Sequence, residues 1–145
     1  MATIATAAER SNISGNNLEF KGVFPANPTP VDSDGRINEK ALEKIIEDNL
    51  AHGADGFWLA GSTGEGPVMS EVQRETTARV AGETISGKGL SIMHVGAIST
   101  ESAAKGAKAA RQYGCDAICC VPPFFFRGGH QMTIDHYKRV ADASD

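Results

Sequence analysis

The sequence has no apolar run long enough to cross a membrane and no excess of basic residues. A membrane helix needs about 20 consecutive apolar residues, and residues 1–19 also lack the basic start and apolar centre of a secretory signal. Lys and Arg total 14 against 18 acidic residues, a net charge of -4, so charge does not favour nucleic acid or an anionic membrane as a partner. We therefore expect a cytoplasmic protein that binds neither.

Cysteine is scarce, and the few cysteines are clustered. Cys115, Cys119 and Cys120 are odd in number and close together, which fits neither a disulfide framework nor a C-x-x-C metal motif. We expect them to be small core residues in a reducing compartment. His130 and His136 have no acidic or cysteine partner at ligand spacing. The sequence therefore predicts no metal site, and no cofactor is expected.

What is present is the composition of one soluble domain, with 145 residues, 41% of them apolar and 22% charged. Residues 1–18 are rich in small polar residues and predict a flexible tail, so the domain is expected at residues 19–145. Strands are expected at residues 20–24, 56–60, 90–95 and 117–121, and helices at residues 38–52, 70–85, 99–113 and from 133 to the end.

Strand and helix thus alternate with a period of roughly thirty residues, the length of one βα unit. This alternation predicts an α/β protein with a parallel sheet. Alternation alone does not distinguish a doubly wound sheet from a barrel, and four units are too few to close an eight-stranded barrel.

The segment that follows the apolar run at residues 56–60 reads Gly-Ser-Thr-Gly-Glu-Gly, and we call these residues, 61–66, the glycine loop. One interpretation is a tight βα turn that needs glycine and has no other role. The other is a loop that binds a carboxylate or phosphate, because it leaves the carboxyl end of a buried strand and carries two hydroxyls and free N–H groups. Nucleotide binding is disfavoured, since the spacing is G-x-x-G-x-G and no Lys-Ser or Lys-Thr follows.

Short motifs recur in order along the four units: Pro28-Thr29-Pro30, Asp55-Gly56, Gly61-Ser62-Thr63-Gly64-Glu65, His94-Val95-Gly96, Tyr113-Gly114-Cys115-Asp116-Ala117 and Val121-Pro122-Pro123-Phe124-Phe125. From about residue 22 to the last residue, the chain resembles the amino-terminal half of the pyruvate-dependent class I aldolases. This is the family of N-acetylneuraminate lyase and dihydrodipicolinate synthase. His94-Val95-Gly96 with the following Ser99-Thr100, and Asp135-His136-Tyr137, resemble the N-acetylneuraminate lyase branch more closely.

The resemblance implies the parallel (β/α) units of a TIM barrel, about four of the eight being present, a half barrel. It also implies a homotetramer in the full-length form, and a lysine that forms a Schiff base with pyruvate or with a 2-oxo acid cleaved to pyruvate and an aldehyde. The alternative within the family is 4-hydroxy-tetrahydrodipicolinate synthase or another 2-oxo acid aldolase.

The resemblance places the pyruvyl carboxylate on Ser62 and Thr63, whose hydroxyls and N–H groups suit that task. A pair of hydroxyls that merely begins a helix is the structural alternative. Gly61, Gly64 and Glu65 are expected to support the loop, Glu65 through hydrogen bonds.

Phe125 stands where the synthase branch carries a tyrosine of its proton relay. Because phenylalanine has no hydroxyl, we expect Phe125, with Phe124 and Phe126, to form an apolar wall or a subunit contact. The catalytic tyrosine, in a Tyr-x-x-Pro segment, and the Schiff-base lysine are expected beyond Asp145.

By this hypothesis the 145 residues are a partial aldolase that is inactive alone. An alternative hypothesis, which makes the chain a binding or structural protein and not an enzyme, is a non-catalytic half barrel that associates with a second copy to bury its open edges.

Overall fold

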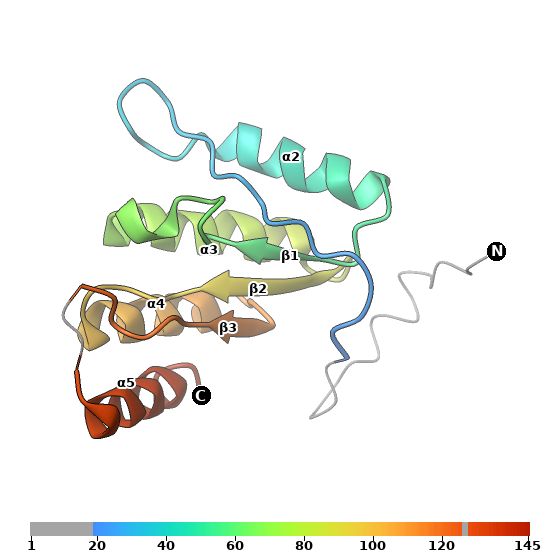
Figure 1. Cartoon of the computed structure of the whole chain (residues 1–145). Coiled ribbons are helices and arrows are strands. Elements are labelled where there is room, and N and C mark those ends of the chain that lie inside the picture. Colours follow the sequence, from blue (N-terminus) through green and yellow to red (C-terminus); the bar gives the residue numbers. More distant parts are fainter. Residues whose placement is uncertain (1–18, 126–127) are drawn as a thin grey trace.

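The computed structural model describes residues 19–125 and 128–145. The tail expected at residues 1–18, and Phe126, lie outside the described residues. At the centre is a parallel sheet of β1 (Gly56–Leu59), β2 (Leu90–His94) and β3 (Ala117–Cys119), in the order β1-β2-β3. Trp58 is in register with Ile92, and Ile92 with Ala117. The predicted α/β architecture with a parallel sheet is confirmed (Figure 1).

The helices are α2 (Glu39–Ala51), α3 (Glu71–Ile85), α4 (Thr100–Gln112) and α5 (His130–Asp142), with a short 3-10 helix η1 (Gly66–Val68) before α3. Helix α3 begins with a capping box, since the Gln73 N–H donates to Ser70 Oγ at 3.2 Å and the Ser70 N–H donates to Gln73 Oε1 at 2.7 Å. Helix α5 begins at His130, earlier than the expected start at Thr133. Its first turn is largely polar and was therefore missed by an apolar pattern.

The strand expected at residues 20–24 is wrong as placed. The chain does run beside β1, but its single bridge to the sheet joins Ala26 to Trp58, in parallel. The Asn27 N–H donates to the Trp58 carbonyl at 2.9 Å, and the Trp58 N–H donates to the Pro25 carbonyl at 3.0 Å. Pro25 and Pro28 have no N–H for a ladder, so this segment takes the place of a first strand without becoming a regular one.

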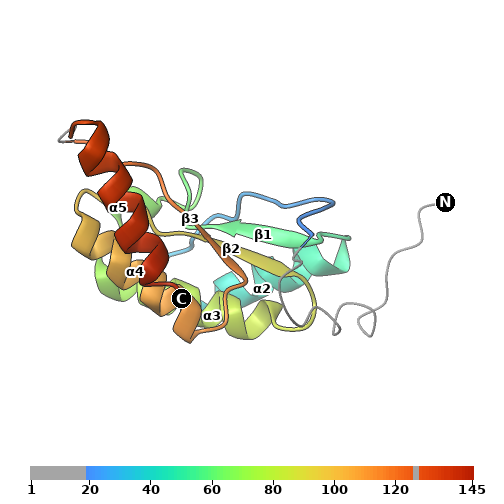
Figure 2. The same ribbon diagram turned by 90° about the horizontal axis from the view of Figure 1, so that it is seen from below.

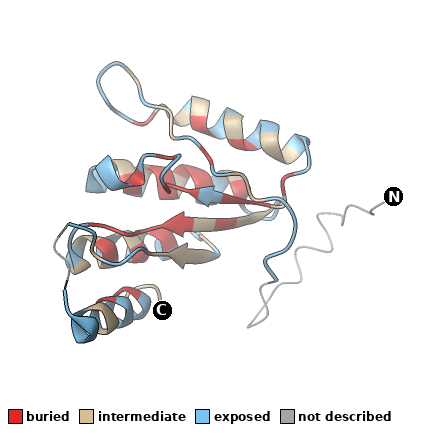
Figure 3. Ribbon diagram, viewed as in Figure 1, coloured by how far each residue is buried: buried red, intermediate tan, exposed pale blue. Residues whose placement is uncertain are grey.

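The helices α2, α3 and α4 lie on one face of the sheet, and α5 packs beside α4 (Figures 1 and 2). Phe57 and Leu59 of β1 and Met93 of β2 are buried in the helix-facing core. Buried residues gather along β1 and β2 and on α3 and α4 behind them (Figure 3). On the other face, Trp58 keeps 40% of its surface exposed, and no described helix covers it.

The three cysteines lie in and beside β3, and all are half-buried. Cys115, before the strand, and Cys120, after it, pack against the core as expected, whereas Cys119, the last residue of the strand, is in register with His94. Burial raises the pKa of Cys115 to about 11 and that of Cys119 to about 12, so both thiols are neutral at pH 7. None of the described helices has the length and apolar character of a membrane span.

Candidate functional site

The glycine loop leaves the carboxyl end of β1 through a sharp backbone reversal. Ala60, directly before it, has φ 51° and Glu65 has φ 56°, so both lie in the left-handed region that non-glycine residues rarely occupy. The Glu65 N–H donates to the Ser62 carbonyl and the Gly66 N–H to the Gly61 carbonyl, each at 3.1 Å. The loop is therefore a closed turn that presents Ser62 and Thr63 at its tip.

Two glycines of the loop permit a contact between backbones. A Cβ on Gly64 would lie 2.9 Å from the Asn27 carbonyl oxygen and 3.0 Å from the Ala60 nitrogen. A Cβ on Gly66 would overlap the Ala60 carbonyl oxygen. Because backbone atoms cannot move aside as a flexible side chain does, any larger residue requires the turn to shift.

A pocket of about 370 Å³ opens beside this turn. Its walls are Phe24 and Ala26 of the first segment, Trp58 of β1, and residues 61–64 of the loop. Ser62 and Thr63 are both exposed. The structure thus brings together four of the predicted site residues, Gly61, Ser62, Thr63 and Gly64, in one pocket at the carboxyl end of β1.

Glu65 and Phe125 lie elsewhere. Glu65 acts in the turn through its backbone, and its side chain is exposed; hydrogen bonding by that side chain stays a prediction. Phe125 is 72% exposed in the connection between β3 and α5. Its neighbour Phe124 forms part of a second, largely apolar pocket of about 570 Å³, also lined by Ile98, Val121 and Met132.

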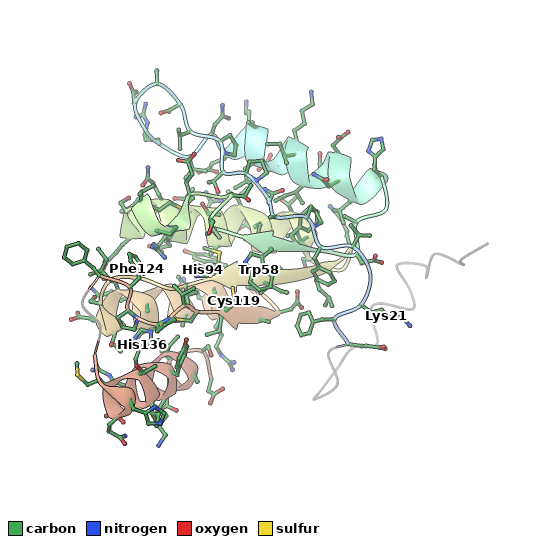
Figure 4. The ribbon with its side chains drawn as sticks, in the orientation of Figure 1. Lys21, Trp58, His94, Cys119, Phe124 and His136 are labelled. Carbon is green, nitrogen blue, oxygen red and sulfur yellow. The ribbon has the colours of Figure 1, made fainter. Side chains whose placement is uncertain are left out.

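Two buried polar side chains under the glycine loop were missed by the sequence analysis. Arg74 of α3 is 7% exposed and donates from Nη2 to the Gly66 carbonyl at 2.6 Å and from Nη1 to the Gly96 carbonyl at 3.0 Å. His94, at the end of β2, is also 7% exposed (Figure 4). The sequence held one signal for the burial of Arg74: it lies four and seven residues before Ala78 and Ala81, the spacing of one helix face.

The electrostatic state of this pair follows from burial. Burial lowers the pKa of His94, the charge of Arg74 lowers it further, and a hydrogen bond with the backbone of Ala60 offsets part of the shift. His94 is therefore neutral at pH 7. Its Nδ1 is buried and has no hydrogen-bond partner in the part of the chain that the structure describes. Burial also lowers the pKa of Arg74, which nonetheless stays charged.

A second buried histidine joins three elements. His136 of α5 is 2% exposed, with Nδ1 2.9 Å from Thr100 Oγ1 at the start of α4 and Nε2 3.3 Å from Cys120 Sγ after β3 (Figure 4). Burial lowers the pKa of His136 and raises that of Cys120, so the pair is neutral and serves as a satisfied polar contact between helices and sheet. Within residues 19–125 and 128–145, no group of three or more His, Cys, Asp or Glu is placed to hold a metal ion.

The sheet, the helices on one of its faces and the loop at its carboxyl edge define an α/β protein built from the units of a TIM barrel. The chain belongs to the dihydrodipicolinate synthetase family, because the sequence profile of that family matches residues 19–145. Among its relatives, N-acetylneuraminate lyase from Citrobacter koseri is 36% identical over 127 residues, which are 88% of this chain and 43% of the relative.

Solved structures share the fold. Dihydrodipicolinate synthase from Aquifex aeolicus is 27% identical with a TM-score of 0.81, over 87% of this chain and 43% of that one. The catalytic lysine mutant of Ruminococcus gnavus sialic acid aldolase is 26% identical with a TM-score of 0.82, over 86% of this chain and 41% of that one. The chain thus spans less than half the length of each of these relatives.

The buried histidines predict how stability depends on pH. The pKa values of His94 and His136 are lowered in the folded chain, so below about pH 6.5 these histidines bind protons more readily in the unfolded chain than in the folded one. We therefore expect the free energy of unfolding to fall as the pH drops through that value, measured by urea unfolding at about pH 7.5 and about pH 5.5. His136→Gln removes one of these two groups and should therefore reduce the fall. An equal fall in the wild-type and variant proteins would contradict this account.

Proposed function

We propose that this chain supplies the carboxylate-binding part of a Schiff-base aldolase, which cleaves a 2-oxo acid of the N-acetylneuraminate type to pyruvate and an aldehyde. The observation that carries the proposal is the closed turn at the carboxyl end of β1, with Ser62 and Thr63 exposed in its pocket. The sequence similarity of the chain to N-acetylneuraminate lyases supports the same substrate class.

The donors of this turn are available to a ligand. Among the described residues, neither the N–H groups nor the hydroxyls of Ser62 and Thr63 are engaged in hydrogen bonds. A carboxylate that accepts from such groups forms charge-assisted bonds, which are shorter and stronger than neutral ones. Trp58 and Phe24 line the same pocket and provide an apolar surface for the remainder of a small 2-oxo acid.

The nucleophile is proposed to come from outside these residues. A Schiff-base lysine is activated by burial, which lowers the pKa of its amine. Every lysine of this chain is exposed, and Lys21, for example, lies beyond the amino ends of the strands (Figure 4). The Ruminococcus gnavus relative has a catalytic lysine by its own description. We propose an equivalent lysine on further chain, and with it the catalytic tyrosine.

Assembly into a homotetramer of the full-length protein, in the cytoplasm, completes the proposal. Its support is a set of exposed apolar side chains around the carboxyl end of β3, where Phe125 is proposed as a subunit contact: Ile98, Val121, Phe124, Phe125 and Met132. Within the family, 4-hydroxy-tetrahydrodipicolinate synthase is the alternative activity, supported by the shared fold of the Aquifex aeolicus enzyme.

The carboxylate site is tested by removing its hydroxyls. Hydrogen bonds to a charged group contribute about 1.5–3 kcal/mol each, so Ser62→Ala and Thr63→Val should each weaken pyruvate binding by at least about ten-fold. Binding is measured by ligand-observed NMR titration of the 145-residue chain. Thr76→Val is the matched control, because its hydroxyl donates to the Val72 carbonyl within α3, away from the pocket. Unchanged affinity in both loop variants would refute the assigned site.

The missing nucleophile is tested by chemical trapping. After incubation with pyruvate and borohydride, we expect no lysine of the chain to carry a reduced pyruvyl adduct, because every lysine is exposed and none lies in a buried site that could activate its amine. Intact-mass and peptide mass spectrometry provide the measurement, and a complete aldolase of the family is the positive control. An adduct at a single lysine here would overturn the assignment of the nucleophile to other chain.

A second candidate is a non-catalytic half barrel that pairs with another copy. The observation in its favour is Trp58, 40% exposed on the sheet face that no described helix covers. Such a closed assembly predicts a discrete dimer in sedimentation velocity. Trp58→Lys should convert it to monomer, whereas Val72→Lys, at a residue 70% exposed on α3, should not. A monomer, or oligomers that grow without limit, would exclude this candidate.

A further inference from the structure

Arg74 is buried without a carboxylate. Among the described residues no acidic side chain lies within ion-pair distance of it, and the two hydrogen bonds of its guanidinium both go to carbonyl oxygens. One belongs to Gly66, the last residue of the glycine loop, and the other to Gly96, in the connection from β2 to α4. Arg74 therefore links the loops that follow two neighbouring strands.

Packing alone does not account for an arginine here. Burying a charged group is costly unless it is well paired, and an apolar side chain of similar volume would fill the space without that cost. Burial lowers the pKa of Arg74, in keeping with this cost. What arginine adds is a rigid planar fork whose two donors hold two acceptors in one geometry, which neither methionine nor lysine reproduces.

Gly66, whose carbonyl accepts from Arg74, is also the residue that closes the glycine loop. The N–H of the same residue closes the turn by donating to the Gly61 carbonyl, with Ser62 and Thr63 between. At the other end of the turn, Ala60 holds a left-handed conformation, and its backbone contacts His94. Such conformations are strained in non-glycine residues and persist only where surrounding contacts determine them. Arg74 therefore holds the last residue of the turn through the Gly66 carbonyl, and His94, at the end of β2, contacts the backbone of Ala60 just before the turn.

We propose that Arg74 is the positioning residue of the glycine loop: by joining the Gly66 and Gly96 carbonyls it holds Ser62 and Thr63 in the geometry that receives a carboxylate. It does not touch the ligand and acts through the backbone of the loop. The ligand-binding part of this proposal rests on the proposed function, whereas the ordering of the loop does not.

The test compares Arg74→Met and Arg74→Lys with Arg79→Met in the 145-residue chain. Arg79 lies on the same helix, but pairs with Glu39 at 2.7 Å and with Glu83 at 3.4 Å, on the side facing α2. Arg74→Met keeps the volume and loses both hydrogen bonds. Arg74→Lys keeps the charge but cannot span both carbonyls, and it serves alone if the methionine variant fails to fold.

Two readouts are taken on each variant. Amide hydrogen exchange of Glu65 and Gly66 reports the order of the turn, because their N–H groups make the hydrogen bonds that close it. We expect this exchange to speed up at least about ten-fold in both Arg74 variants, with little change at the buried amides of β1 and β2. Arg79→Met should leave the loop amides at the wild-type rate. Pyruvate affinity should fall about ten-fold in step with the loop exchange.

The outcomes separate the possibilities. Wild-type exchange at Glu65 and Gly66 in a folded Arg74 variant would overturn the proposal, and so would an equal acceleration at every amide, which is what a simple packing residue gives. Faster loop exchange with unchanged pyruvate affinity would overturn the positioning role. If the wild-type chain binds no pyruvate, the proposed function fails, and the exchange data alone then decide whether Arg74 orders the loop.

Discussion

The candidate site depends on a contact of backbone against backbone at the end of β1. Gly64 and Gly66 lie against Ala60 with no space for side chains, and the turn they allow carries Ser62 and Thr63 out to the pocket. A turn of this kind is short of side chains that could hold it, so its order must come from hydrogen bonds to its carbonyls. Arg74 provides one such bond from the helix layer, at the cost of a buried charge.

The two faces of the sheet differ in how far they are covered. The helix-facing side is a closed core around Phe57, Leu59 and Met93. The opposite side, with Trp58, is the side that a complete barrel would enclose, and four βα units cannot curve far enough to do so. The two proposed functions differ in what would cover this open face. In the aldolase it is covered by further chain, and in the self-associating half barrel by a second copy.

Sequence reasoning performed well wherever a local signal decides the structure. The start of α3, where Ser70 and Gln73 form a capping box, the glycine turn and the βα alternation all follow from residues close together in the chain. It failed for residues 20–24, because the chain meets the sheet only farther along, at Ala26, where the prolines at 25 and 28 on either side prevent a regular strand. It also read the start of α5 late, because the first turn of that helix is largely polar.

The sequence by itself determined the family, the parallel βα order and the residues at the tip of the glycine loop. Only the tertiary structure decided what lies beneath that loop. Arg74 comes from α3, whereas Gly66 follows β1 and Gly96 follows β2, and no local pattern in the sequence predicts that these three residues meet. They meet because parallel strands bring their carboxyl ends to one edge, and because α3 packs back across β1 and β2. A long-range contact of that kind is a property of packing, which local sequence patterns do not contain.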